Sequence, residues 1–152
     1  MSKKQWVLVS VALVLAVLYV IYFTNWFKPK IIHISYTERS IRLRGRPGTP
    51  TILFGFGGQR YRLTEIKVVP LDAWQTNHFI LPVWDLNSTT NSVPMTAFSY
   101  GQRLRGMNPV VPGARPEPLQ TNVTYRIFVW AGSRKGQCDF QLGGKPPADS
   151  AP

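Results

Sequence analysis

The chain has 152 residues, with 18 lysines and arginines, 7 aspartates and glutamates and a formal net charge of +11. Hydrophobic residues make up 44% of it and aromatic residues 12%, which is enough for a packed core and excludes a wholly disordered chain. The single cysteine excludes an internal disulfide and a zinc site built from several cysteines.

The first 27 residues differ from the rest of the chain. In the eighteen residues 6–23, Ser10 is the only polar side chain apart from two tyrosines. Eighteen helical residues span about 27 Å, and continuing to Phe27 gives about 33 Å, which brackets the roughly 30 Å hydrocarbon core of a bilayer. We therefore expect a short basic N-terminus at 1–5, a transmembrane helix at 6–27 and a juxtamembrane tether at 28–30.

Residues suited to a membrane–water interface stand at both ends of this segment. Aromatic rings are enriched where membrane helices cross the interface, and lysines mark the return to water. The lipid bilayer is thus an expected partner, and the expected interface anchors are Trp6, Trp26, Phe27, Lys28 and Lys30.

A cleaved signal peptide and a buried core helix are the alternative explanations of this segment. A cleaved signal ends in small residues, whereas residues 18–23 are bulky. A core helix has a polar face, and this segment has none. The pattern favours an uncleaved anchor.

The charges on the two sides of the anchor give opposite indications of its orientation. Lys3 and Lys4 favour a cytoplasmic N-terminus, whereas the larger number of lysines and arginines after the helix favours the reverse. Long folded domains translocate largely regardless of charge. We therefore expect a single-pass membrane protein whose C-terminal domain is extracytoplasmic, and periplasmic if the cell is bacterial.

Beyond the tether, short β-rich runs alternate with turn residues. Strands are expected at 31–36 (with 41–44 as its extension after a turn), 51–56, 61–69, 79–86, 96–100, 123–131 and 137–142, with loops at 45–50 and 107–118. About seven short strands without helical periodicity predict an all-β fold, a small antiparallel sandwich at 31–143. A disordered tail is expected at 144–152.

Residues 119–132, LQTNVTYRIFVWAG, resemble the corner between strands E and F of fibronectin type III and related immunoglobulin-like domains. In those domains a leucine precedes, by six residues, a tyrosine whose hydroxyl bonds back to the backbone. The corresponding residues are Leu119 and Tyr125, and Trp84 is similar to the buried tryptophan of an early central strand. The resemblance, over 119–142, implies an immunoglobulin-like sandwich with a binding or scaffolding role.

Candidate catalytic and cofactor sites have little support. Residues 55–60 are glycine-rich but lack the pattern of a phosphate-binding loop, which predicts a hairpin turn. Cys138 has no histidine near it in sequence, and a catalytic thiol needs a base within hydrogen-bonding reach. His33 and His78 have no metal-ligand spacing. We therefore predict no enzyme, no cofactor and no metal site.

The remaining pattern is pairs of arginines spaced two residues apart. Such a pair lies on one face of any strand that carries it, so its two charges can act together. One interpretation is a solvated face that keeps sheet edges from pairing. The other is a surface for anionic lipid headgroups, envelope polymers or an acidic partner protein. The candidate surface consists of Arg42, Arg44, Arg46, Arg60, Arg62, Arg103 and Arg105.

The sequence thus predicts a non-catalytic single-pass membrane protein that presents an interaction domain at the membrane surface. We expect a structural or accessory component of an envelope assembly, with another membrane or envelope protein as partner. The alternative is an anion-binding module that engages acidic lipid or polymer through strands carrying Arg-x-Arg. The expected location and the lack of a recognised reader motif argue against nucleic acid.

Overall fold

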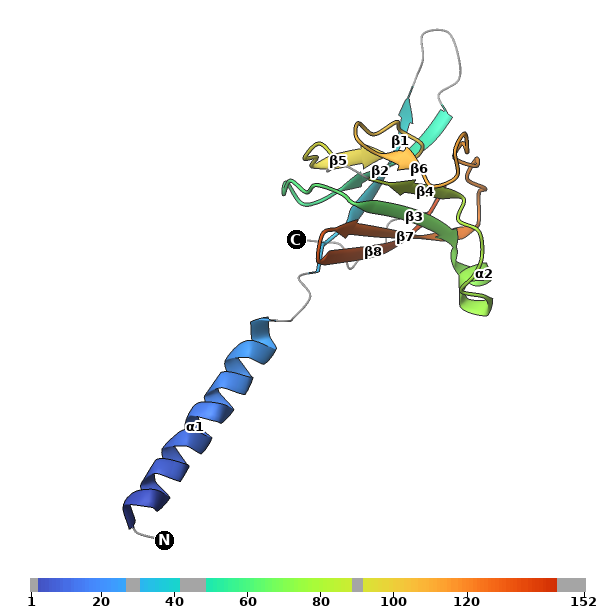
Figure 1. Cartoon of the computed structure of the whole chain (residues 1–152). Helices are drawn as coiled ribbons and strands as arrows, with labels where there is room; N and C mark the ends of the chain where they lie inside the picture. Colours follow the sequence, from blue (N-terminus) through green and yellow to red (C-terminus); the bar gives the residue numbers. More distant parts are fainter. Residues whose placement is uncertain (1–2, 27–30, 42–48, 89–91, 145–152) are drawn as a thin grey trace. The chain divides into compact units, whose positions relative to one another are not determined.

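The computed structural model describes residues 3–26, 31–41, 49–88 and 92–144 (Figure 1). The chain forms two compact units, Met1–Lys30 and Ile31–Pro152. The first contains the helix α1 (Lys3–Trp26), and the second, called the β domain below, is mostly β.

The helix α1 is apolar on every side. Within the described residues it is the one helix, at Lys3–Tyr22, that is long and apolar enough to cross a membrane. Every described side chain of α1, from residue 3 to residue 22, is exposed. A helix that packed into a soluble core would bury a stripe of these side chains. Its length and composition therefore match those of a membrane-spanning helix.

Within the described residues, the β domain contains eight strands and one short helix. They are β1 (Ser35–Ile41), β2 (Thr49–Gly55), β3 (Glu65–Pro70), α2 (Leu71–Thr76), β4 (Trp84–Asn87), β5 (Ala97–Ser99), β6 (Asn108–Pro109), β7 (Thr124–Ala131) and β8 (Arg134–Gln141). The strands form two sheets, ordered β1-β2-β5 and β6-β4-β3-β7-β8, in which neighbouring strands are antiparallel. The prediction of a mostly β domain with antiparallel strands is confirmed.

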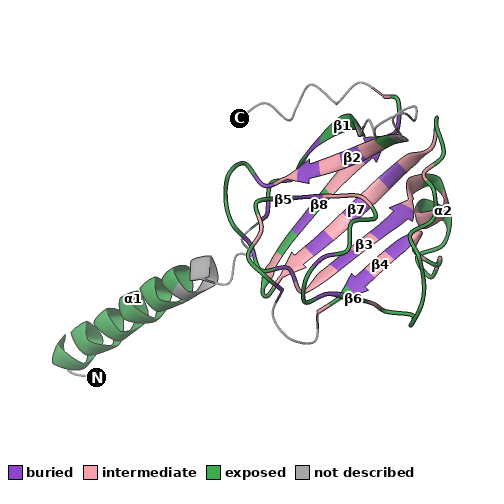
Figure 2. Ribbon diagram, turned by 90° about the horizontal axis from the view of Figure 1, so that it is seen from above, coloured by how far each residue is buried: buried purple, intermediate pink, exposed green. Residues whose placement is uncertain are grey.

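Both sheets contribute to one apolar core. Along β7, buried and half-buried residues alternate, because successive side chains of a strand point to opposite faces (Figure 2). Rings from the two sheets meet in this core: Phe54 of β2 lies 5.0 Å from Phe140 of β8, measured between ring centroids. Trp84 of β4 likewise lies 6.0 Å from Phe98 of β5. The two sheets are therefore held together by aromatic packing between their inner faces.

The chain enters the β domain along β8. Ile31 forms a parallel bridge with Lys135, and the backbone N–H of Ile32 donates to the Lys135 carbonyl oxygen at 2.8 Å. A Cβ added to Gly136 would lie 2.6 Å from the Ile32 carbonyl oxygen, so only glycine allows this approach. The strand predicted at 31–36 is therefore divided: residues 31–34 lie against β8, and β1 starts at Ser35.

Two other predicted strands are too long. Tyr61 pairs with Met95 in an isolated bridge, so β3 begins only at Glu65 rather than at residue 61. Leu71–Thr76 forms α2, which begins after Pro70 and was not predicted. The next residues form a turn, in which the Asn77 side-chain oxygen accepts the Phe79 N–H at 2.9 Å, and β4 starts at Trp84.

Several predicted boundaries involve residues outside this description. The strand at 41–44 and the loop at 45–50 fall mostly within 42–48, and nearly all of the tail at 144–152 lies beyond Gly144. Within the predicted loop at 107–118, Asn108–Pro109 pairs with β4 and forms β6.

Candidate interaction surfaces

The described residues offer little for metal or nucleophilic chemistry. Among them, no group of three or more His, Cys, Asp or Glu side chains is placed to hold a metal ion. The half-buried Cys138 thiol donates to the Asp139 carbonyl oxygen at 3.6 Å. Burial, and secondarily the Asp139 charge, raise the pKa of this thiol to about 11. It is therefore protonated at neutral pH, and a protonated thiol is a poor nucleophile.

The pairs Arg60/Arg62 and Arg103/Arg105 lie between the strands that the structure describes, not on them. Arg60 and Arg62 are exposed on either side of the buried Tyr61, which lies outside β3. Leu104 is likewise buried, between the exposed Arg103 and Arg105 in the segment that joins β5 to β6. Arg42, Arg44 and Arg46 lie outside the described residues.

Three segments that carry basic residues, 60–62, 103–105 and 134–135, meet at one end of the β domain. The backbone groups of Tyr61 and Met95 exchange two hydrogen bonds of 3.0 Å, and the Val93 N–H donates to the Arg105 carbonyl oxygen at 3.5 Å. The Arg134 guanidinium lies over the Tyr61 ring, 5.7 Å from its centroid. Because Ile31 pairs with Lys135, the chain from α1 enters here too. We call this the basic end: Arg60, Arg62, Arg105, Arg134 and Lys135.

A row of aromatic rings crosses the outer face of the five-stranded sheet. Trp74 of α2 lies 5.4 Å from Phe128 of β7, and Phe128 is stacked at 5.9 Å on Trp130. His78 extends the row, 4.9 Å from Trp74. Trp74, Phe128 and Trp130 are half-buried and His78 is exposed. We call these four residues the aromatic row.

Next to the aromatic row, the turn after α2 presents two large apolar side chains to solvent. Phe79 is 94% exposed and Leu81 is 84% exposed. The turn is held by Asn77, whose side-chain oxygen accepts the Phe79 N–H and whose carbonyl oxygen accepts the Ile80 N–H at 3.4 Å. We call Phe79 and Leu81 the apolar tip.

Charges on this outer sheet face are balanced. The Arg126 guanidinium donates two hydrogen bonds, of 2.6 and 2.8 Å, to the carboxylate of Asp139. Lys67 lies 3.4 Å from Glu65 and opposite Asp85 in the register of β3 and β4. Burial, and secondarily the Glu65 charge, raise the pKa of Asp85, although Lys67 opposes this. In the described strands, the face carries three bases and three acids: Lys67, Arg126, Lys135, Glu65, Asp85 and Asp139.

The residues assigned to the resemblance all pack against the core. The Tyr125 hydroxyl oxygen accepts a hydrogen bond of 3.0 Å from the backbone N–H of Gln120. Leu119 is half-buried against the core, just before the turn at Asn122, whose φ is 67°. Trp84 is 5% exposed, with its ring 5.1 Å from that of Tyr100.

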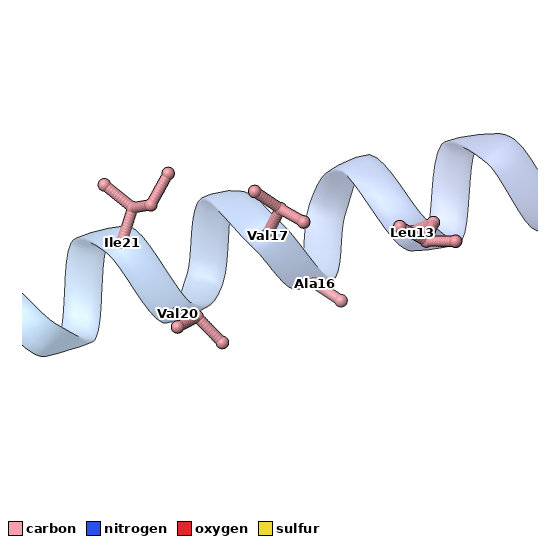
Figure 3. Close-up of a pocket in the computed structure, with 5 residues that line it drawn as sticks. All are labelled: Leu13, Ala16, Val17, Val20 and Ile21. Carbon is pink, nitrogen blue, oxygen red and sulfur yellow. The ribbon is translucent and has the colours of Figure 1, made fainter.

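Two of the predicted membrane-interface residues belong to α1. Trp6 is near its beginning and Trp26 is its last residue, whereas Phe27, Lys28 and Lys30 lie outside the described residues. A shallow groove along one side of the helix is lined by Leu13, Ala16, Val17, Val20 and Ile21 (Figure 3). These side chains are all aliphatic, so the groove offers no polar group to orient a small ligand.

Sequence reasoning missed the aromatic row and the apolar tip, although signals for both are present. Residues 73–84 contain no Asp, Glu, Lys or Arg. Trp74 and His78 are four residues apart, a helical spacing, and Phe128 and Trp130 have the spacing of one strand face. The helix α2 brings the two pairs together.

The chain has no match among protein-family models, curated proteins or solved structures. Its function is therefore argued from its own sequence and surfaces.

Proposed function

We propose that this chain is a non-catalytic single-pass membrane protein that holds an immunoglobulin-like β-sandwich at the membrane surface. In this proposal the sandwich is an interaction domain within an envelope assembly. The observation that carries it is a helix apolar on every side followed, four residues later, by a separate β unit.

The short link is important because it limits where the β domain can go. The five Cα steps from Trp26 to Ile31 reach at most about 18 Å when fully extended. A domain confined to this distance from its anchor has a high effective concentration toward other proteins in the same membrane. This favours a structural or accessory role toward a membrane partner.

The strand order supports the immunoglobulin-like assignment. In such domains strands A, B and E share one sheet, and C, F and G share the other. If β1, β2, β3, β5, β7 and β8 correspond to A, B, C, E, F and G, the two sheets divide in the same way, with β4 and β6 added beside β3. The hydrogen bond between Tyr125 and Gln120 is then the corner bond at the start of strand F. Trp84 departs from the pattern, because it lies on β4 rather than on β3.

Topology and crosslinking together test this proposal. In intact cells or spheroplasts, added protease should digest the β domain, and chemical crosslinking at native expression levels should join the protein to a membrane partner. Protection from protease until permeabilisation would place the domain in the cytoplasm. Recovery of monomer alone after crosslinking would contradict a role in an assembly.

A second candidate function, binding to anionic lipid headgroups, is supported by the basic end. Its five cations gather where the chain from α1 enters, and the Glu65 carboxylate at that end is already paired with Lys67. A basic residue near an anionic membrane surface contributes about 1 kcal/mol to binding, and salt weakens the attraction.

This candidate is tested with the full chain in nanodiscs that contain or lack phosphatidylglycerol. Hydrogen exchange around Arg60 and Arg62 should slow with the anionic lipid, and the effect should disappear at high salt. Changing both to glutamine should abolish it. The matched control, Arg39→Gln with Arg115→Gln, removes the same charge from other exposed positions and should retain it. Equal exchange in both lipids would reject this function.

A further inference from the structure

We propose that the outer face of the five-stranded sheet is a self-association surface, on which the apolar tip of one copy packs against the aromatic row of a second copy. This deepens the proposed function and rests on it, because it names the partner as another copy in the same membrane. Four observations lead to it in steps: exposure, absence of charge, charge balance, and position on the domain.

The first step is the apolar surface that a single copy leaves exposed. Phe79 and Leu81 are 94% and 84% exposed, and a hydrogen-bonded turn holds them there. His78, the residue before Phe79, lies 4.9 Å from Trp74, and the half-buried rings of Trp74, Phe128 and Trp130 extend from there across α2 and β7. Contiguous exposed patches of this kind mark interaction sites, whereas scattered exposed apolar residues do not.

The second step is the lack of charge in the segment that supplies the tip. Residues 73–84 contain no Asp, Glu, Lys or Arg, although the whole chain has 25 such residues. The buried centres of protein–protein interfaces are depleted in charge and enriched in aromatic residues. Protein is therefore a better match for this surface than an anionic lipid or polymer.

The third step is the charge balance of the face, which favours a second copy as the partner. Outside the outer sheet face, the described β domain has seven arginines and three acidic residues, Glu38, Asp72 and Glu117. The rest of the described β domain therefore carries a net positive charge. Two copies that approached through those regions would repel each other. The outer sheet face carries three bases and three acids, so two copies can meet there without that repulsion.

The fourth step is the position and shape of the surface. The apolar tip follows α2 at the Pro70 end of β3, whereas the chain from α1 enters at the Glu65 end. The tip thus lies at the opposite end of β3 from the basic end and from the point where the chain enters the β domain. A two-fold interface must be self-complementary, and one copy supplies both projecting side chains and an aromatic surface to receive them.

Site-specific photocrosslinking of the full chain in its membrane tests this inference. Two differently tagged copies are co-expressed, one of them with photoreactive benzoylphenylalanine at position 79. Illumination should give an adduct of twice 17.2 kDa that carries both tags. The same photoreactive residue at position 37, in place of the exposed Thr37 on β1 of the other sheet, is the matched control and should give no such adduct.

A second photocrosslinking experiment measures how far the yield of homodimer depends on the apolar tip, with the photoreactive residue placed outside the tip. The photoreactive residue replaces Gln137, which is exposed and lies opposite Phe128 in the register of β7 and β8. The changes Phe79→Ser and Leu81→Ser, made together, should lower the yield of homodimer at least tenfold. Val93→Ser with Val111→Ser removes two other exposed aliphatic side chains and should leave the yield unchanged.

The outcomes separate this inference from the proposed function. A homodimer that persists after the two changes in the tip overturns the inference, because the copies then meet elsewhere. If position 79 forms adducts with other proteins and none with a second copy, the inference is overturned. The proposed function as an interaction domain is not contradicted by that result. No adduct from position 79 or position 137 with any protein contradicts both proposals.

Discussion

The two faces of β7 differ in what covers them, although both are rich in apolar and aromatic side chains. On the inner face, Tyr125, Ile127 and Val129 are buried against the core. On the outer face, Phe128 and Trp130 remain half-exposed, beside the ion-paired Arg126. The same strand thus serves the stability of the fold on one side and leaves aromatic area available for contact on the other.

This difference shows that hydrophobicity alone does not assign a residue to the core. Inner-face residues pack against the β1-β2-β5 sheet, whereas the outer face carries charged side chains and is contacted by α2. Substitutions on the inner face should therefore lower the free energy of unfolding. Substitutions on the outer tip should change association and leave that free energy nearly unchanged.

The largest effect is expected at the centre of the inner face. Ile127 is 0% exposed, so Ile127→Ala removes buried methyl groups and leaves a cavity, at a cost of about 2–5 kcal/mol. Denaturant unfolding of the full chain in detergent micelles, followed by tryptophan fluorescence, measures this. Gln137→Ala on the exposed side of β8 is the control. A loss below about 1 kcal/mol would contradict the packed inner face.

The next largest effect is expected at Gly136. In Gly136→Ala the new Cβ would lie 2.6 Å from the Ile32 carbonyl oxygen, and 2.9 Å from the Ile32 Cβ. The chain must shift to admit it, at a cost of about 1–3 kcal/mol. In the control, Gly55→Ala, the nearest atom is the Ser35 hydroxyl oxygen at 3.4 Å. Equal stability of the two variants would show that the contact between residues 31–34 and β8 is loose.

A smaller effect is expected for Tyr125→Phe, which removes the acceptor of the Gln120 N–H. Because Gln120 is exposed, its N–H can bond to water instead, and we expect a loss of about 1 kcal/mol. The same unfolding measurement detects it. A change within experimental error would remove the corner bond as support for the immunoglobulin-like assignment.

The Cys138 thiol gives a test of the inner face that depends on pH. Burial raises its pKa from 9.0 to about 11, so the folded state favours the protonated form. The resulting contribution to stability is present below pH 9 and is lost as the pH rises through about 11. At pH 8, alkylation should be about 100-fold slower in the folded chain than in denaturant, since a shift of two pKa units lowers the thiolate fraction by that factor. Equal rates would mean that the thiol is solvated.

The smallest effect on stability is expected at the apolar tip. Phe79→Ser with Leu81→Ser removes side chains that are 94% and 84% exposed, so the free energy of unfolding should change by less than about 0.5 kcal/mol. Denaturant unfolding of the two-residue variant, beside the unchanged chain, provides the measurement. A loss of 2 kcal/mol, about the size of a core substitution, would show that the tip packs within its own domain.

The apolar helix α1 and the β class were predictable from sequence because each depends on a local pattern. An unbroken apolar run predicts α1, and alternation along residues 123–131 predicts β7. The hydroxyl bond of Tyr125 was expected from the resemblance to immunoglobulin-like domains, in which such a tyrosine follows a leucine by six residues. These signals do not depend on which segments meet in space.

The aromatic row was not predictable in the same way, because it depends on α2. The prediction assigned residues 79–86 to one strand, whereas Asn77 turns the chain and exposes Phe79. Six residues of helix after Pro70 carry too short a pattern to recognise, yet they place Trp74 over Phe128. The basic end is similar: Arg62 and Arg134 are far apart in sequence and meet through Tyr61, whose ring Arg134 covers.

The contact of residues 31–34 with β8 also has a mechanical consequence. Tension applied to α1 reaches the β domain first at Ile31, before any strand of the β1-β2-β5 sheet. Ile32 is 1% exposed over Gly136, and its N–H is bonded to Lys135, so this segment must slide out of the core before β1 can be peeled from β2. Tension along the chain from α1 therefore loads the contact of residues 31–34 with β8 before the pairing of β1 with β2.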